Sequence, residues 1–320
     1  MKFNFFSKTS FIGKILFILI LFLTIIFINK LDLVKKENFI DKREKFTKYY
    51  GNDIYDEFYV SIYDTLMYDE VKNTYEVQEI INLKTPNNVK RLLDIGSGTG
   101  HHVNLLSNNN SNQVIGIDIS PSMINKAKLN YPEMKFKQGN ALDNMLFQDN
   151  EFTHITCLNM TIYSIKDKEQ FFENCFKWLS PGGVLVINLV DIRNFNPILP
   201  SADVVALMSS QINNNSRVTE SNIEFKDFTY KSNFELKEEN YSSKKLNKAN
   251  GFFTEKIVFN NNNSNNINEY VRINEHQYYM NTQKAILSIA KDVGFIYQGY
   301  SKLDNVNYKN NYLYWLYKPE

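Results

Sequence analysis

The feature that most constrains this chain is an apolar run at residues 89–95 that leads directly into glycines at alternate positions, Gly96, Gly98 and Gly100. Glycine lets the backbone turn sharply and approach a ligand that a Cβ atom would keep away. A helix is predicted to begin at His101, so its free N–H groups would face the same space. The sequence therefore predicts a strand, a tight turn and a helix with a ligand site at the turn.

The next apolar run, residues 114–117, ends at Asp118. A carboxylate at the tip of a second parallel strand is placed to hydrogen-bond ribose hydroxyls. The dinucleotide fingerprint would need a glycine where this chain has His101, and Asp94 beside the turn would repel a pyrophosphate. Asp94 instead suits a cofactor that carries an ammonium and a sulfonium. A nicotinamide oxidoreductase is disfavoured by this spacing and by the absence of an obvious hydride-transfer acid or base.

Five segments in order resemble the motifs of class I S-adenosylmethionine-dependent methyltransferases with a type-11 methyltransferase domain. Asp94 with the three glycines resembles the first motif, and the others are residues 117–123, 139–142, 152–160 and 179–185. The family usually has Asp where this chain has Asn140. The resemblance implies S-adenosyl-L-methionine as cofactor and a Rossmann-like α/β fold. Its sheet would have seven mostly parallel strands, the last of them antiparallel.

The resemblance also implies which residues contact the cofactor. Asp118 would hold the ribose, Ile119 would flank the adenine, and Tyr63 would contact the cofactor from a lid. Tyr63 fits equally well as an aromatic that packs its helix onto the sheet, and His101 as a solvent-facing residue at a helix start. The full predicted set is Asp94, Gly96, Gly98, Gly100, His101, Asp118, Ile119, Asn140, Ala141, Asn159 and Tyr63.

Two residues are candidates for the acceptor side. Tyr163 follows the fourth strand, where relatives often place a histidine or tyrosine. His276 lies beside Tyr278 and Tyr279 and could serve as a base, although an ordinary hydrogen-bonded histidine is the simpler interpretation. The four histidines have no metal-ligand spacing, so no metal site is predicted.

The chain divides into five predicted segments. An N-terminal transmembrane helix (1–29) and a charged stalk (30–50) precede a methyltransferase core with an N-terminal lid (51–190). An inserted antiparallel β subdomain (191–280) resembles the substrate cover of glycine and sugar-amine N-methyltransferases. A C-terminal helix and a final hairpin (281–320) would complete the core.

The N-terminal apolar run, Ile15 to Ile28, indicates a membrane anchor. Extended back to Phe11 it would form a helix of about 27 Å, just enough to span a thin bilayer. The lysines that flank it favour a catalytic domain on the cytosolic side. A cleaved signal peptide, which would direct the chain to the secretory lumen, is the alternative. It is disfavoured because the run ends without the small residues that a signal peptidase prefers.

The formal net charge of +1 gives no indication of a nucleic-acid surface, and two cysteines do not suggest a disulfide scaffold. The predicted function is a membrane-anchored methyltransferase. It would move a methyl group to a nucleophilic nitrogen or oxygen of a small molecule or a membrane-proximal acceptor. The alternative is a non-catalytic, membrane-tethered S-adenosylmethionine-binding or scaffold module. Neither the acceptor nor the oligomeric state can be read from the sequence.

Overall fold

The computed structural model describes residues 45–84, 90–108, 113–198, 217–238, 248–259 and 270–320. Its contacts divide the chain into two units, one of residues 1–45 with 261–270 and one of residues 46–260 with 271–320. The predicted membrane anchor and most of the predicted stalk lie outside the described residues. The site described below lies within the second unit.

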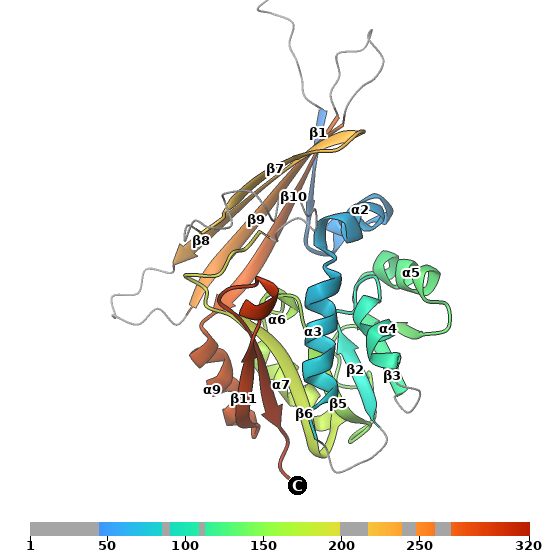
Figure 1. Ribbon diagram of the computed structural model, residues 1–320, viewed down its shortest axis with the longest axis vertical. Helices are drawn as coiled ribbons and strands as arrows, with labels where there is room; N and C mark the ends of the chain where they lie inside the picture. The colour runs from blue at the N-terminus through green and yellow to red at the C-terminus, as the bar shows by residue number, and fades with distance from the viewer. Residues whose placement is uncertain (1–44, 85–89, 109–112, 199–216, 239–247, 260–269) are drawn as a thin grey trace, which may run out of the picture. The chain divides into compact units, whose positions relative to one another are not determined.

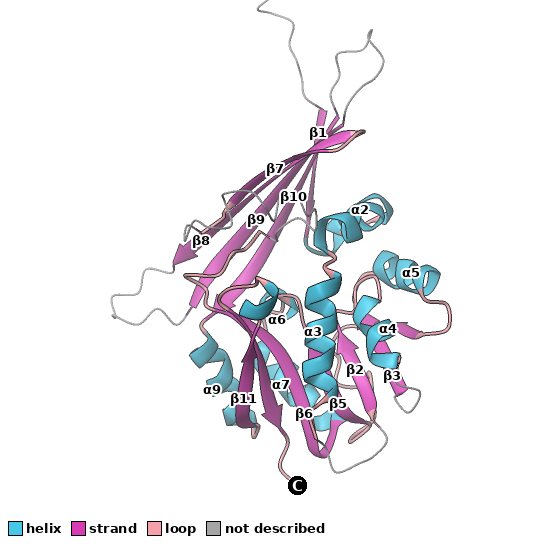
Figure 2. Ribbon diagram, in the orientation of Figure 1, coloured by secondary structure: helices cyan, strands magenta, loops and turns pink. Residues whose placement is uncertain are grey.

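The core of this unit is a seven-stranded sheet in the order β11-β12-β6-β5-β2-β3-β4 (Figures 1 and 2). All of its strands run parallel except β12, which is antiparallel to both β6 and β11. The predicted mostly parallel sheet with an antiparallel last strand is thus confirmed. The strands are β2 (Arg91–Ile95), β3 (Gln113–Asp118), β4 (Lys135–Gln138), β5 (Phe152–Cys157), β6 (Leu179–Val190), β11 (Ile296–Lys302) and β12 (Asn311–Tyr317).

Helices cover both faces of this sheet because its strands are apolar on both sides. In β2, Leu92 belongs to a cluster with Val103 of α4, whereas its neighbour Leu93 belongs to one with Phe171 of α7. Alternate residues of a strand point to opposite faces, so one short apolar run supplies both layers. The helices of this unit include α3 (Glu70–Ile81), α4 (His101–Ser107), α5 (Pro121–Asn130), α6 (Thr161–Ser164), α7 (Lys168–Trp178) and α9 (Gln283–Val293).

Helix starts follow local capping chemistry. Ser120 caps α5 by accepting the N–H of Met123, with Pro121 at the first helical position. Thr282 caps α9 in the same way, and Gly294 ends that helix at φ +120°. Both helices therefore begin directly after a residue whose side chain caps them.

The inserted region forms a second, antiparallel sheet in the order β1-β10-β9-β8-β7. Residues 220–238 form a hairpin, because the chain turns at Phe225, whose N–H bonds to the carbonyl of Phe228. One detail differs from the predictions. The end of the predicted stalk forms a strand, in which Tyr49 stacks on Arg272. The strands are β1 (Lys45–Tyr50), β7 (Glu220–Glu224), β8 (Phe228–Glu238), β9 (Lys248–Phe259) and β10 (Tyr270–Asn281).

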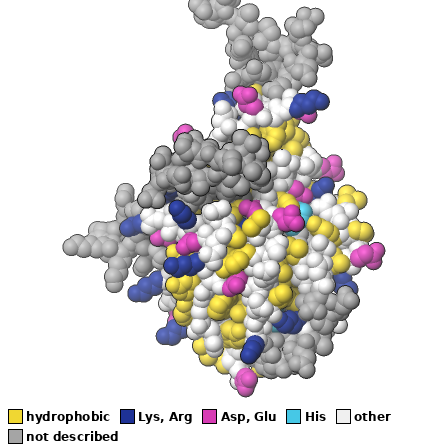
Figure 3. All heavy atoms as spheres, in the orientation of Figure 1, with side chains coloured by type: hydrophobic (Ala, Val, Ile, Leu, Met, Phe, Trp, Pro, Cys, Tyr) yellow, Lys and Arg dark blue, Asp and Glu magenta, His cyan; other side chains and the backbone are white. Residues whose placement is uncertain are grey.

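The start of the predicted core, where an N-terminal lid is expected, folds as the short helix η2 (Gly51–Ile54) and the helix α2 (Glu57–Met67). A second short helix, η3 (Asp304–Val306), precedes β12. Within the described parts of the chain, no helix is long and apolar enough to cross a membrane. On the face that Figure 3 shows, acidic and basic side chains are interspersed among apolar ones.

Candidate functional site

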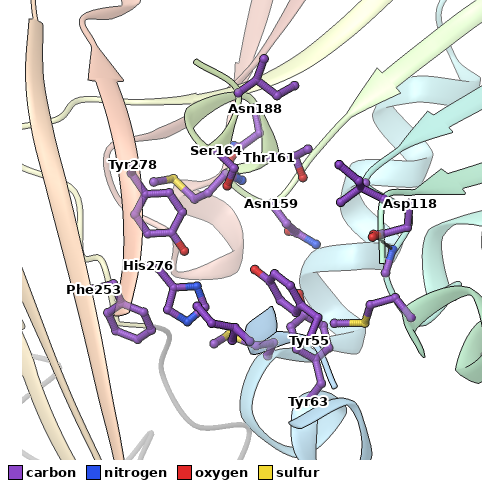
Figure 4. Close-up of a pocket in the computed structure, with 18 of the residues that line it drawn as sticks. Tyr55, Tyr63, Asp118, Asn159, Thr161, Ser164, Asn188, Phe253, His276 and Tyr278 are labelled. Atoms are coloured by element: carbon purple, nitrogen blue, oxygen red, sulfur yellow. Dashed lines mark hydrogen bonds between the residues drawn. The ribbon is translucent and has the colours of Figure 1, made fainter. Parts of the chain in front are cut away.

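A cavity of about 470 Å³ joins the carboxyl ends of β2 and β3 to the inner face of the inserted sheet. Figure 4 shows Asp118 at one end and His276, Phe253 and Tyr278 at the other, with Asn159 between them. The volume is that of a small-molecule site. After the roles that the sequence predicts for these two residues, the Asp118 end is called the cofactor end and the His276 end the acceptor end.

The turn after β2 requires glycine, but its three glycines have different roles in the structure. Gly96 (φ +73°) and Gly98 (φ +53°) line the cavity. A Cβ at Gly96 would lie 2.6 Å from the side chain of Thr161, whereas one at Gly98 would meet nothing nearer than Tyr63, 3.9 Å away. Gly100 (φ +94°) does not line the cavity; a Cβ there would lie 2.6 Å from the ring of Phe136. Gly100 therefore serves the packing of the turn and the start of α4, not ligand contact.

Asp118 ends β3 with its carboxylate at the cavity wall. One oxygen accepts the N–H of Gly98 at 3.0 Å, and the other accepts the N–H of Ser120 at 2.9 Å. Burial raises the pKa of Asp118, and these backbone N–H groups oppose that rise. The next residue, Ile119, lines the same wall and is 41% exposed. Both lie where the motif predicts them.

Asp94 and His101 lie outside the main cavity, on a polar recess of about 60 Å³ beneath the glycine turn. Asp94 accepts the hydroxyl of Thr156 at 2.6 Å, and burial raises its pKa. His101 stacks on Tyr68 with ring centroids 3.9 Å apart and contacts the hydroxyl of Tyr131 at 2.6 Å. Its ring is thus occupied by other aromatic residues, which argues against the predicted cofactor contact.

The third motif lines the cavity through Asn140 and Ala141. The side-chain oxygen of Asn140 accepts the N–H of Leu142 at 3.0 Å, which closes a local turn. The amide N–H₂ of Asn140 and the second lone pair of this oxygen remain available to a ligand.

The position of Tyr163 in the structure contradicts its predicted acceptor-side role. It is fully buried and does not line the cavity. Its hydroxyl accepts the N–H of Val190 at 3.0 Å and lies 3.5 Å from the carbonyl oxygen of the same residue. The short helix α6 turns Tyr163 into the core and leaves Thr161 and Ser164 facing the cavity, at helical spacing.

His276 lines the cavity, and its ring contacts a buried carboxylate that the sequence analysis did not single out. Its Nε2 lies 2.8 Å from Oε2 of Glu255, which is fully buried. Glu255 also accepts the hydroxyls of Tyr59 (2.8 Å) and Tyr230 (2.6 Å) and the side-chain amide of Asn274 (3.0 Å). Burial alone would raise the pKa of Glu255, but bonds from His276, Tyr230 and Asn274 hold it below its usual value. The signal in the sequence that could have identified Glu255 is an acidic residue at an inward-facing position of β9.

Lys72 is a second residue that the sequence analysis missed. It is buried yet lines the cavity, and its Nζ lies 2.8 Å from Glu76 and bonds to the side chain of Asn159. Asn159 and Met160 have φ values of +48° and +66°. Such left-handed backbone in non-glycine residues is characteristic of functional sites.

The segment that contains Tyr63 is fastened over the cavity by a buried arginine. Arg272 of β10 contacts Asp56 at 2.6 Å and donates to the carbonyl of Ile54 at 2.7 Å. Asp56 also caps α2 by accepting the N–H of Tyr59. These bonds hold η2 and α2 against the inserted sheet, so that Tyr63 faces the cavity as predicted.

Comparison with known proteins agrees with this architecture. Residues 92–183 match the methyltransferase domain family. Over 97 residues the chain is 30% identical to a demethylmenaquinone methyltransferase of Chlorobaculum parvum, covering 30% of this chain and 39% of the relative. Over 125 residues it is 29% identical to a trans-aconitate 2-methyltransferase of Variovorax paradoxus, covering 39% and 48%. The chain thus spans less than half the length of these relatives.

Solved structures match over a longer stretch. An S-adenosylmethionine-dependent methyltransferase from Clostridium acetobutylicum has a TM-score of 0.56 at 14% identity, over 82% of this chain and 98% of that one. An amino pentose methyltransferase from Micromonospora echinaspora, solved with S-adenosylmethionine bound, has a TM-score of 0.56 at 14% identity, over 82% and 96%. A sugar N-methyltransferase from a Streptoalloteichus species has a TM-score of 0.55 at 16% identity, over 82% and 93%. Residues 92–183 thus form a methyltransferase domain, and the fold around it is that of class I S-adenosylmethionine-dependent methyltransferases.

Proposed function

We propose that this protein transfers a methyl group from S-adenosylmethionine to a nucleophilic nitrogen or oxygen of a small molecule. The observation that carries the proposal is that one cavity reaches both the glycine turn with Asp118 and the buried pair Glu255–His276. A cofactor at the first end and an acceptor at the second would meet inside a space of small-molecule size. The substrates of the structural neighbours, an amino pentose and a sugar nitrogen, are small molecules too.

The residues at the cofactor end fit S-adenosylmethionine. Asp118 would accept bonds from the ribose hydroxyls, and Ile119 would flank the adenine. Lys72 would pair with the carboxylate of the methionine part, since it is the buried cation among the described cavity residues. When bound, the cofactor supplies a methyl group on a sulfonium, whose C–S bond breaks with its electron pair left on sulfur.

The chain itself would align the reactants and exclude water. Residues 51–67, fastened by Arg272, would close the cavity over the cofactor. His276 would accept a proton from the acceptor group, and Glu255 would orient its ring. No residue is needed to activate the leaving group, because a sulfonium already leaves readily.

We further propose that residues 15–28 anchor the protein in a membrane with the catalytic domain in the cytosol. The proposal rests on the apolar sequence and its flanking lysines. Separation of cell membranes from the soluble fraction tests it. Recovery of the full chain in the soluble fraction, with this segment still present, would refute it.

Isothermal titration of S-adenosylmethionine into the full chain tests the cofactor site. We expect saturable binding that Asp118→Ala abolishes, because the variant loses the ribose acceptor and uncaps the N–H groups of Gly98 and Ser120. Asp149→Ala is the matched control, since the Asp149 side chain is 66% exposed and Asp149 does not line the cavity. Failure of the folded wild-type protein to bind S-adenosylmethionine would refute the proposal. Binding without methyl transfer to any small molecule would favour the non-catalytic alternative.

A further inference from the structure

The acceptor end holds a buried carboxylate that no lysine or arginine among the described residues contacts. The donors to Glu255 are two tyrosine hydroxyls, the amide of Asn274 and the ring of His276. The nearby guanidinium of Arg272 is engaged instead with Asp56, with the carbonyl of Ile54 and with the side-chain oxygen of Asn274. A fully buried carboxylate is costly unless a positive charge compensates it. This end of the cavity therefore favours a cation.

Aromatic rings enclose the same place. The ring centroid of His276 lies 5.5 Å from that of Phe253, 6.0 Å from Tyr55, and 6.2 Å from both Tyr59 and Tyr278. Figure 4 shows Phe253, Tyr278 and Tyr55 gathered around His276. Aromatic faces attract cations through the ring quadrupole, most strongly where water is excluded. Rings and carboxylate together form the chemistry of an ammonium site.

The same lining offers little to an anion. Among the described residues that line the cavity, the cationic side chains are Lys72 and Lys166. Lys72 is paired with Glu76 at the cofactor end, and Lys166 is exposed to solvent. A phosphate or carboxylate acceptor would therefore enter the Glu255 end without a partner for its charge.

We propose that the methyl acceptor is a small amine, which binds as its ammonium between the aromatic rings and the Glu255–His276 pair and gives its proton to Nδ1 of His276. This inference rests on the proposed function and names its acceptor class. It assigns two roles. His276 is a catalytic residue that touches the acceptor, and Glu255 is a positioning residue that acts through it and through its charge.

The hydrogen bond to Glu255 settles which ring nitrogen is free. An ionised carboxylate only accepts, so Nε2 of His276 carries the proton in that bond, and Nδ1 is the nitrogen that accepts a proton when the ring is neutral. In the proposed step an N–H bond of the ammonium breaks, its electron pair stays on the amine nitrogen, and the proton bonds to Nδ1. The summed charge of amine, His276 and Glu255 does not change. The step thus yields a nucleophilic amine without creating an additional buried charge.

Three probes that share one ring test the inference by isothermal titration into the full chain saturated with S-adenosylhomocysteine. Cyclohexylamine, cyclohexanol and cyclohexanecarboxylate differ only in the head group. At pH 7.5 we expect the amine to bind at least about ten-fold tighter than the other two. An alcohol or carboxylate that binds as tightly as the amine, or the absence of binding by all three, would overturn the inference.

Glu255→Gln keeps the size of the side chain and removes its charge. We expect this variant to lose the preference for the amine while it binds cyclohexanol as the wild type does, a selective change that a merely structural role would not produce. The control is Glu235→Gln on the neighbouring strand β8, where the side chain is 61% exposed and the preference should persist. A preference unchanged in Glu255→Gln would overturn the proposal.

A second variant decides the proton step if Glu255→Gln does not fold. His276→Gln can still donate to Glu255, so it should bind the amine within about three-fold of wild type and methylate it at least about 100-fold more slowly. Methylation at the wild-type rate would overturn the role of His276. Titration of S-adenosylmethionine distinguishes failure of this inference from failure of the proposed function. A wild-type protein that binds S-adenosylmethionine but shows no preference for the amine refutes only the inference about the acceptor.

Discussion

The two ends of the cavity are built by different means. The cofactor end depends on main-chain geometry within one continuous stretch, in which Gly96, Gly98 and Asp118 position N–H groups and one carboxylate. The acceptor end depends on buried side chains far apart in sequence, where Glu255 meets Tyr59 and His276. A local motif can thus specify the first end, whereas the second end exists only after the inserted sheet and the lid have packed together.

Glu255→Ala should have the largest effect, because it removes the group on which the acceptor end is built. Two tyrosine hydroxyls, the Asn274 amide and His276 would lose their acceptor inside the protein. We expect the free energy of unfolding to fall by about 4 kcal/mol. Urea unfolding followed by circular dichroism measures this. Glu235→Ala, at an exposed position of β8, should change stability by less than about 0.5 kcal/mol. Equal losses of stability in the two variants would contradict the structural role of Glu255.

Acid should lower the stability of the fold through His154, which lies in the seven-stranded sheet, whereas His276 lies in the inserted sheet. His154 is fully buried, and its polar contact is the hydroxyl of Thr153 at 2.9 Å. Burial lowers its pKa from 6.5 to about 4. Above pH 6.5 the residue is neutral in both states, so its contribution to stability is complete. As the pH falls from 6.5 to 4, the unfolded chain binds a proton that the folded chain does not.

The loss of stability over this range is about 3 kcal/mol. Urea unfolding at pH 7.5 and pH 4.5 measures it, and His154→Asn should remove most of the difference. An equal pH dependence in wild type and variant would show that other groups, such as the buried carboxylates, dominate acid unfolding.

The sequence allowed the glycine turn, the position of Asp118 and the core sheet to be predicted because their signals are local. The apolar run before Gly96, the acid at Asp118 and the cap at Ser120 each act on neighbours a few residues away. The inserted sheet was predicted in outline from alternating residues. The pairing of β1 with β10 was not, since nothing local to residues 45–50 specifies a partner more than 200 residues later.

Tyr163, Lys72 and Glu255 show why other site residues were misplaced or missed. Tyr163 follows β5 as the family pattern suggests, but a single turn of helix decides whether it faces the cavity or the core. Lys72 and Glu255 look like ordinary surface charges in the sequence. Their burial depends on partners that only the folded chain supplies, namely Glu76 with Asn159 for the lysine and His276 for the acid.

Removal of the lysine at the cofactor end should weaken cofactor binding without affecting the acceptor end. Lys72→Met alone would leave the charge of Glu76 buried, so the informative variant is Lys72→Met with Glu76→Leu. We expect this double variant to bind S-adenosylmethionine about ten-fold more weakly, a loss of about 1.4 kcal/mol. Its stability should also fall by about 1 kcal/mol, because Glu76 bonds to Nε2 of buried His102 at 2.8 Å. Unchanged affinity would place the cofactor's carboxylate elsewhere.

Tyr163→Phe should have the smallest effect and tests whether this residue belongs to the core and not to the acceptor end. The variant keeps the ring in its buried place and removes the hydroxyl that accepts the N–H of Val190. We expect unfolding to become easier by about 1 kcal/mol and the rate of methyl transfer to stay within about two-fold of wild type. Urea unfolding and a methyl-transfer assay measure the two quantities.

A rate of methyl transfer that falls 100-fold in Tyr163→Phe at unchanged stability would show that Tyr163 acts on the acceptor after all. Tyr278→Phe provides the comparison, because Tyr278 lines the cavity and its ring stacks against His276 with centroids 6.2 Å apart. If Tyr278 contacts the acceptor through its hydroxyl, its loss should change the rate more than the stability. Tyr278→Phe would then change the rate of methyl transfer more than the stability, and Tyr163→Phe would change the stability more than the rate. This is the difference expected between a residue that faces the cavity and one that faces the core.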